Sequence, residues 1–329
     1  MIKPFFARGV LAEAFLVDQN SDKHAIDITA TAAALGTLFF WSLGPIFIKY
    51  LAGYLDSWTQ NLLRYSVACV FWLPYLLYCY KTDRLDQSVW KRAIPPAVAN
   101  TTMQSFWAAG LYYAGPAFMV LLTKMNIIWI AGFSMILFRE ERSLIKSWQF
   151  WLGLVLCLVG VFGVLYFKVD ITQGRTLVGV VLGLITAFMW GVYMVSARAA
   201  FRNIDSAAGF SVVTIYTVIG LCILGFAFGN VGKSLQMGAP QWGAVVISSI
   251  TAIALAHALY YASMRRIGAT IPALIVLVQP FTVLAISHFA FDESMNLLQI
   301  LSGIILLLGA GLAIWAQQHL GQDRTHPEA

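Results

Sequence analysis

Long runs of hydrophobic residues alternate with short polar segments along almost the whole chain. A helix needs about 20 apolar residues to cross a hydrocarbon core roughly 30 Å thick, and ten runs approach or exceed that length. Several connections between the runs are only a few residues long, so successive helices are expected to be antiparallel neighbours. The predicted membrane spans are residues 29–52, 59–80, 93–113, 116–138, 148–168, 177–199, 208–230, 240–264, 269–291 and 295–318.

Little of the chain remains for a soluble domain. The polar parts are a leader, residues 1–28, a tail, residues 319–329, and short loops. No secretory cleavage signal is visible in the leader. Its apolar stretch is interrupted by Arg8 and Glu13, which makes it a candidate for a short interfacial helix. This arrangement argues against a soluble catalytic domain.

The composition fits a chain that faces lipid. Of the 329 residues, 60% are hydrophobic and 11% are charged, whereas a soluble domain carries about 25% charged residues. The four cysteines lie inside apolar runs without metal-ligand spacing. The net charge of +6 comes from basic residues in loops between the runs, a pattern of membrane topology that argues against nucleic acid as a partner.

The basic residues also predict an orientation. Most lysines and arginines fall in the leader, the tail and alternate loops, whereas the opposite side has Lys49, Lys168, Arg175 and Lys233. The positive-inside rule then predicts a multi-pass protein of the cytoplasmic (inner) membrane with both termini in the cytoplasm.

The chain repeats itself at an offset of about 150 residues. Residues 41–49 match residues 190–198, with a tryptophan and a cation eight positions apart, and residues 110–114 match residues 258–262. Each unit has five spans, so the second copy must be inverted relative to the first. Inverted repeats are typical of carriers that bind substrate between the repeats, near the middle of the bilayer.

The order of these doubled features resembles the drug/metabolite transporter superfamily, and within it the EamA-type ten-helix exporters, over about residues 30–318. The shared features are a tryptophan midway along spans one and six, Leu-Tyr-Tyr-Ala at the end of spans three and eight, small residues opening spans four and nine, an acid closing them and a glycine near the start of spans five and ten. The residues that carry these features are Trp41, Trp190, 111–114, 259–262, Glu140 or Glu141, Glu293, Gly153 and Gly303.

The resemblance implies an all-α integral membrane protein with ten transmembrane helices, arranged as two inverted five-helix repeats around a central cavity. The repeats are expected at residues 29–168 and 177–318. It also implies export of amino acids or related small metabolites. The chain departs from the family where a proline is frequent midway along spans four and nine. Pro280 is present in the second copy, Ile127 replaces it in the first, and Lys124 lies just before that position.

Lys124 is the least expected residue in the spans. It lies about eight residues into span four, roughly 12 Å from the outer end at 1.5 Å per residue. An ammonium at this depth costs at least ~2.5 kcal/mol and usually faces a cavity; the alternatives are snorkelling or structural pairing. The acidic residues all lie in the leader, loops, helix ends or tail. This charge must therefore be compensated in one of three ways. Lys124 loses its proton, or backbone carbonyls accept hydrogen bonds from it, or the anionic group of a substrate pairs with it.

Other side chains within the spans have either a structural or a functional interpretation. Arg64, near the outer end of span two, is interpreted as structural. His257 either forms a structural hydrogen bond or, with no carboxylate in the spans, carries protons. The remaining polar and aromatic candidates either hold helices together or line a cavity. The candidate substrate-binding residues are Lys124, Trp41, Gln104, Trp107, Asn126, Trp190, Tyr193, His257, Tyr260 and Gln279.

No motif indicates catalysis, a metal site or a cofactor. Residues 229–234 resemble a phosphate loop, but Ala227 stands where the motif needs glycine and no strand is expected before it. The sequence therefore predicts a secondary transporter of small metabolites, more specifically an exporter and not an enzyme. The alternatives are an integral membrane enzyme and a non-transporting sensor or scaffold. The oligomeric state stays open, with a homodimer among the alternatives.

Overall fold

The protein is helical throughout the described residues, which in this computed structural model are 27–82, 85–138, 146–168, 174–201, 204, 206–267 and 270–322. Seven long helices are continuous: α2 (Ile28–Leu51), α3 (Ser57–Lys81), α5 (Ile94–Tyr113), α8 (Trp148–Lys168), α9 (Gly174–Ala200), α10 (Ser206–Phe228) and α15 (Leu297–Gln322). Residues 1–26 of the leader and the Glu140–Glu141 pair lie outside these residues.

Three further segments are assembled from shorter pieces. They are α6 (Pro116–Thr123) with α7 (Asn126–Leu137), α11 (Ala239–Ser248) with the π-helix η4 (Ser249–Leu255) and α12 (Ala256–Ile267), and α13 (Thr270–Leu277) with α14 (Gln279–Phe291). The short helix α4 (Ser88–Arg92) and the 3-10 helix η3 (Val231–Gln236) lie in connections.

These ten segments agree with the ten predicted spans to within four residues at every end. Eight of them are long and apolar enough to cross a membrane by length and composition alone. The other two are α5, which carries Asn100, Thr101 and Gln104, and α13–α14. The predicted all-α membrane fold is confirmed.

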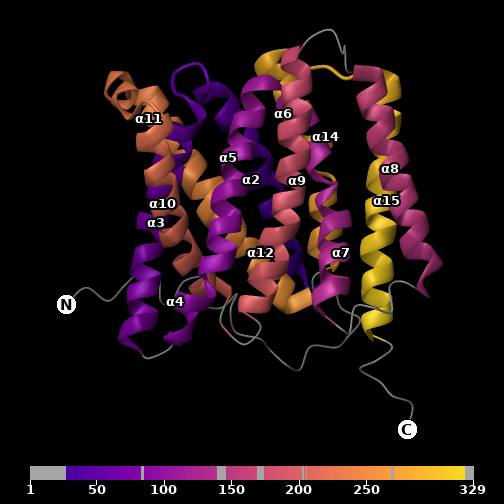
Figure 1. Ribbon diagram of the computed structural model, residues 1–329, viewed down its shortest axis with the longest axis horizontal. Coiled ribbons are helices and arrows are strands. Elements are labelled where there is room, and N and C mark those ends of the chain that lie inside the picture. Colours follow the sequence, from indigo (N-terminus) through magenta and orange to yellow (C-terminus); the bar gives the residue numbers. More distant parts are fainter. Residues whose placement is uncertain are drawn as a thin grey trace.

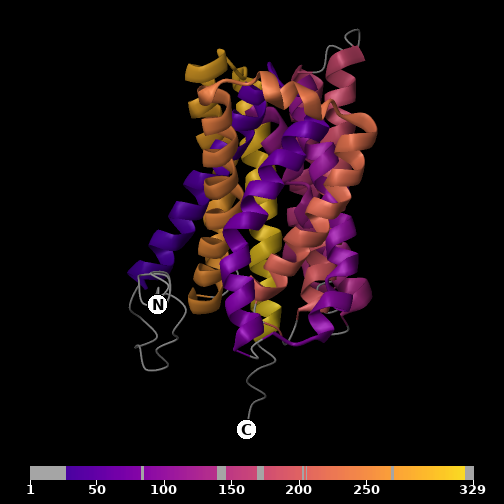
Figure 2. The same ribbon diagram turned by 90° about the vertical axis from the view of Figure 1, so that its left-hand side faces the viewer.

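All the segments run roughly along one direction, up and down the bundle (Figure 1). α2 begins and α15 ends at the same end of the bundle, and the two side views agree (Figures 1 and 2). We call this the terminal end and the opposite one the far end. α2 runs from the terminal end to the far end, whereas α9, its counterpart in the second repeat, runs the other way (Figure 1).

Contacts between the repeats follow the same two-fold pattern. α2 packs against η4, α12, α13 and α14 of the second repeat, and α9 packs against α5, α6 and α7 of the first. α3 pairs with its counterpart α10, and α8 pairs with its counterpart α15. Each repeat thus inserts its first helix between the third and fourth segments of the other, which gives the inverted-repeat architecture that the sequence predicts.

Side chains in the connections cap the N-termini of several long helices. The Asp27 side chain accepts from the Ala30 N–H at 2.9 Å to start α2, and Asp56 accepts from the Thr59 N–H at 2.8 Å to start α3. Asn296 and Gln299 exchange hydrogen bonds of 2.8 Å as a capping box before α15.

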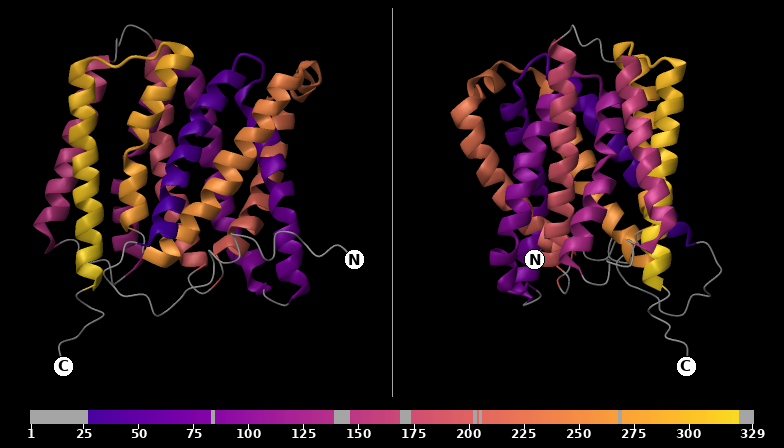
Figure 3. Two further views of the ribbon diagram at one scale, coloured as in Figure 1. Left: turned by 180° about the vertical axis from the view of Figure 1, so that it is seen from behind. Right: turned by 45° about the vertical axis from the view of Figure 1, so that its right-hand side comes forward.

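The α8–α15 pair forms one edge of the bundle (Figures 1 and 3). A Cβ added at Gly153 would touch the Gly309 carbonyl, and one added at Gly309 would touch the Cys157 amide nitrogen. Glycine therefore lets the two backbones approach closely, as is common between membrane helices. The other eight segments surround most of the candidate residues.

Candidate functional site

Spans four and nine are both interrupted near their middles. Between α6 and α7 the Lys124 N–H donates to the Leu121 carbonyl at 3.1 Å, and between α13 and α14 the Val278 N–H donates to the Ile275 carbonyl at 3.2 Å. Both are short-range bonds that replace the regular α-helical pattern. Interrupted helices near the middle of the membrane are where carriers expose backbone groups to substrate.

Lys124 points from the first repeat toward the interruption in the second. Its ammonium Nζ donates to the Gln279 side-chain oxygen Oε1 at 2.9 Å and to the Val276 carbonyl at 3.3 Å. In the described part of the chain, no carboxylate pairs with it. Backbone and amide oxygens therefore compensate this charge, which is one of the alternatives that the sequence left open.

Gln279 extends this contact to a third span. It is 9% exposed, and its Nε2 donates to the Trp41 carbonyl in α2 at 3.0 Å. Lys124, Gln279 and the carbonyls of Val276 and Trp41 thus form one connected set, which we call the central polar chain. It links spans four, nine and one.

Aromatic rings gather beside the central polar chain. The Trp41 ring centroid lies 5.2 Å from that of His257 and 5.0 Å from that of Tyr260. Phe210 stacks on His257 at 4.5 Å, and Tyr261 lies next to both rings. These five residues form an aromatic cluster that adjoins the central polar chain at Trp41.

His257 uses one ring nitrogen within its own span. Its Nδ1 lies 2.7 Å from the Ile253 carbonyl of the π-helix η4. A carbonyl only accepts, so the hydrogen is assigned to Nδ1. The other nitrogen, Nε2, is then the one available for proton exchange.

The structure therefore brings five predicted candidates together: Lys124, Gln279, Trp41, His257 and Tyr260. Tyr193 joins this group at its margin, because its hydroxyl lies next to that of Tyr261 in the aromatic cluster.

The other four candidates are less closely involved. Trp107 packs on a cluster of Ala117, Val120 and Val283. Trp190 packs among the residues between α5, α9 and α10, and the Gln104 backbone carbonyl accepts from Asn61 at 2.6 Å. Asn126 is partly exposed, and no hydrogen bond of its side chain occurs among the described residues.

Phe210 was missed by the sequence argument. It is the ring on which His257 stacks, but nothing in its local pattern distinguishes it from the other phenylalanines in the spans. Only the packing of α10 on α12 brings it to the site.

Arg64 also has a partner that the sequence did not reveal. It is 3% exposed, and its Nε donates to the Ser248 hydroxyl at 3.0 Å. This bond joins α3 of the first repeat to the last residue of α11 in the second, directly before the π-helix. The contact is consistent with the structural interpretation of Arg64.

At the far end, Glu293 connects the repeats. Its carboxylate accepts from the Ala117 N–H at 3.1 Å and the Phe118 N–H at 3.3 Å, at the start of α6, and from the Ser287 hydroxyl at 2.6 Å. A negative charge is stabilised at a helix N-terminus. Gly115 gives the carboxylate room, because a Cβ there would collide with it.

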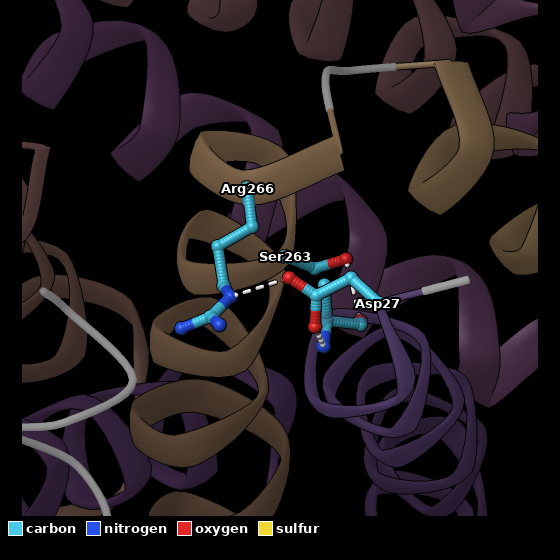
Figure 4. A network of polar contacts seen from close by, with 4 residues as sticks. Asp27, Ser263 and Arg266 are labelled. Carbon is cyan, nitrogen blue, oxygen red and sulfur yellow. Dashed lines mark hydrogen bonds and ion pairs between the residues drawn. The ribbon is translucent and has the colours of Figure 1, made fainter. Parts of the chain in front are cut away.

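At the terminal end, a second contact joins the repeats (Figure 4). The Arg266 Nε of α12 lies 2.8 Å from the Asp27 carboxylate at the start of α2, and the Ser263 hydroxyl donates to the Ala30 carbonyl at 2.8 Å. The hydrogen bond from Arg266 lowers the pKa of Asp27 below its ordinary value. The repeats are therefore tied together at both ends of the bundle as well as at its centre.

Two apolar grooves open on the bundle. One, of about 510 Å³, lies between α2, α11 and α14, with Phe47, Tyr50 and Ile247 in its lining. The other, of about 470 Å³, lies between α13–α14 and α15, with Phe281 and Trp315 in its lining. Neither groove is lined by Lys124 or Gln279.

Known proteins are similar to this chain in sequence or in fold. An uncharacterised transporter of Haemophilus influenzae is 25% identical over 216 residues, which are 64% of this chain and 69% of that protein. An uncharacterised transporter of Archaeoglobus fulgidus is 22% identical over 289 residues, which are 86% of this chain and 96% of that protein. A protein of known crystal structure has a TM-score of 0.61 at 17% identity over 86% of this chain and 96% of its own, a likeness of fold alone.

The sequence profile of the EamA-like transporter family matches the chain twice, over residues 28–166 and residues 177–315. The two matches coincide with the two five-segment repeats and together span most of the chain. They agree with the drug/metabolite transporter resemblance that the sequence motifs indicate. The chain therefore belongs to the EamA-like transporter family.

Proposed function

We propose that this protein exports amino acids or related zwitterionic or anionic metabolites by alternating access, with Lys124 binding the anionic group of the substrate. The observation that carries the proposal is the position of the Lys124 ammonium. It points between the two repeats, and its partners in the described part of the chain are uncharged oxygens.

Electrostatics favours a negatively charged group at this point. An ammonium in a medium of low dielectric is incompletely compensated by neutral acceptors. A carboxylate that approaches it gains a charge-assisted hydrogen bond, which is about twice as strong as a neutral one. A lipophilic cation would be repelled by Lys124 and by the buried Arg64.

Export is the expectation that the family resemblance brings, and the basic loops favour a cytoplasmic location for both termini. On this basis the terminal end faces the cytoplasm and the far end faces outward. The proposal is one of binding and transport, because the described residues of the site offer a binding cation and aromatic surfaces.

The test compares substitutions at Lys124 in proteoliposomes. A mixture of the twenty proteinogenic amino acids first identifies which one is transported. For that amino acid, Lys124→Gln is expected to raise KM at least tenfold, because a lost charge-assisted hydrogen bond contributes about 1.5–3 kcal/mol. Lys124→Arg should retain part of the activity, since a guanidinium does not replace a compact ammonium.

Lys233→Gln is the matched control, because Lys233 is an exposed lysine in η3 at the far end. It should leave KM unchanged. An unchanged KM in Lys124→Gln, with correct folding, would refute the proposed binding role.

We also propose that His257 carries the coupling proton, through the Nε2 that its bond to Ile253 leaves available. His257→Gln should abolish transport driven by a pH gradient but retain exchange of substrate across the membrane. Phe210→Leu, which removes the stacked ring but no titratable group, is the control and should keep the proton dependence. Proton-driven transport that persists in His257→Gln would assign this histidine to packing.

A further inference from the structure

Two prolines remove hydrogen-bond donors from the helices that meet at the central polar chain. In an α-helix each carbonyl accepts from the N–H four residues later, and proline has no N–H. Pro45 lies inside α2, four residues after Trp41, and Pro280 lies in α14, four residues after Val276. The carbonyls of Trp41 and Val276 therefore lose their regular donors.

The central polar chain supplies replacement donors to these two carbonyls. The Lys124 ammonium donates to Val276 at 3.3 Å, and the Gln279 amide donates to Trp41 at 3.0 Å. Lys124 also donates to Gln279 at 2.9 Å, so the two replacements are connected. Within a membrane, a carbonyl without a donor is costly, and helices with proline depend on neighbouring groups to satisfy it.

This arrangement occurs at one of the two equivalent interfaces between the repeats, the one formed by α2. The residues aligned with Pro45 and Pro280 in the other copy are Met194 and Ile127, which both have an N–H. The Ile127 N–H donates to the Lys124 carbonyl at 3.3 Å. The prolines thus lie where α2 packs on α13 and α14, and not where α9 packs on α6 and α7.

We propose that Lys124 and Gln279 form a latch that holds the proline bends of α2 and α13–α14 in one conformation, and that the anionic group of the substrate opens it. The opening step rests on the proposed function, because it requires Lys124 to bind that group. When Lys124 turns to the substrate, Val276 loses its donor and Gln279 loses the contact that orients it toward Trp41. Both helices are then free to bend at their prolines, where membrane helices kink.

The first test is a double-mutant cycle on the thermal stability of the purified protein. Lys124→Met should lower the unfolding midpoint by about 2–4 °C, because Val276 is left without a donor. Pro280→Ala restores an N–H four residues after Val276. In that background Lys124→Met should lower the midpoint by less than half as much. Equal losses in both backgrounds would overturn the latch.

Gln279 and Pro45 offer an independent version of the cycle if Pro280→Ala does not fold. Gln279→Leu should lower the midpoint in the wild type and lower it less in Pro45→Ala, which restores a donor for Trp41. Again, equal losses would contradict the proposal.

The second test measures conformation, which a purely stabilising contact would not change. Spin labels at Ile28 and Lys91, both exposed at the terminal end of the bundle, report the position of α2 relative to α4 after the native cysteines are replaced by alanine. Lys124→Met should add a second population with a different distance between the labels, and Pro45→Ala, which removes the proline of α2, should reduce that population. A distance distribution that is the same in all three proteins would refute the latch.

Transport by the double variant separates this inference from the proposed function. Lys124→Met with Pro280→Ala should recover stability but not transport of the identified amino acid, since the binding cation is still absent. Recovery of both would support the latch and refute substrate binding by Lys124. Recovery of neither would refute the latch.

Discussion

Gly115 and Glu293 show how one missing side chain permits a contact between the repeats. The Glu293 carboxylate occupies the space where a Cβ at position 115 would lie and accepts from the first N–H groups of α6. Such a carboxylate acts as a helix cap supplied by another part of the chain. Caps of this kind contribute about 1 kcal/mol.

Gly115→Ala is therefore expected to displace Glu293 and to lower the unfolding midpoint by about 2–4 °C. The control is Gly132→Ala in α7, where an added Cβ meets no atom within 4 Å. That substitution should be neutral or slightly stabilising, because alanine favours helix more than glycine does. Thermal unfolding followed by circular dichroism measures both. Equal midpoints for the two variants would show that Glu293 does not depend on Gly115.

Asp27 makes the contact at the terminal end sensitive to pH. Its pKa is lowered by Arg266, so the ionised form is favoured in the folded protein. For a carboxyl with a lowered pKa, the stabilisation is present above the ordinary pKa of about 3.9 and is lost as pH falls through the folded-state value. The two side chains are 21% and 29% exposed, so the pair contributes modestly, about 0.2–1 kcal/mol.

Asp27→Asn tests this charge, because asparagine still caps α2. The variant should unfold at a lower temperature than the wild type at pH 7, and the difference should shrink as pH falls below about 3.9 and should also shrink in 1 M salt. A difference that is the same at pH 3 and pH 7 would show that the charge of Asp27 is not involved.

At the scale of helices, hydrophobicity predicted where spans begin and end, but not where they are interrupted. The predicted ends agree with the structure because the residue types change from apolar to polar within one or two turns where a helix leaves the hydrocarbon core. The interruption at Lys124 and the π-helix η4 have no such marker, since both are built from residues that also suit a regular helix. Pro280 was a marker, and it does coincide with the interruption between α13 and α14.

The same limit applies to the candidate site. The depth of Lys124 and its lack of a carboxylate could be read from the sequence, because both depend on position along one span. Its partners could not, because Val276 and Gln279 come within reach only when span four of one repeat packs beside span nine of the other. Trp41 and His257 were recognised as residue types suited to a site, while Phe210 needed the packed structure.

For the whole molecule, the odd number of spans in each repeat was the strongest sequence argument. Five spans reverse the direction of the chain, so a second copy can follow the first only upside down. The opposite directions of α2 and α9 and the exchanged contacts between the repeats confirm this. The sequence could not predict that the prolines would come together on one side of that symmetry, because Pro45 and Pro280 are far apart in the chain.

The arrangement of the segments also makes a testable statement about the membrane. Asp86 lies in the connection after α3 at the terminal end, and Leu235, which is 88% exposed, lies in η3 at the far end. The connections near Asp86 are rich in lysine and arginine. By contrast, the described segment from α10 to α11, which contains Leu235, has Lys233 as its one basic residue. The positive-inside rule therefore predicts that Asp86 lies in the cytoplasm and Leu235 outside.

A membrane-impermeant maleimide applied to intact cells should label Leu235→Cys at once and Asp86→Cys only after the membrane is permeabilised. The native cysteines are replaced by alanine for this measurement. The reverse pattern would invert the orientation while leaving the fold intact, and it would place the far end, with its Glu293 contact, on the cytoplasmic side. Labelling of both positions from the same side would contradict the arrangement of the segments itself, because the structure places these two connections at opposite ends of the bundle.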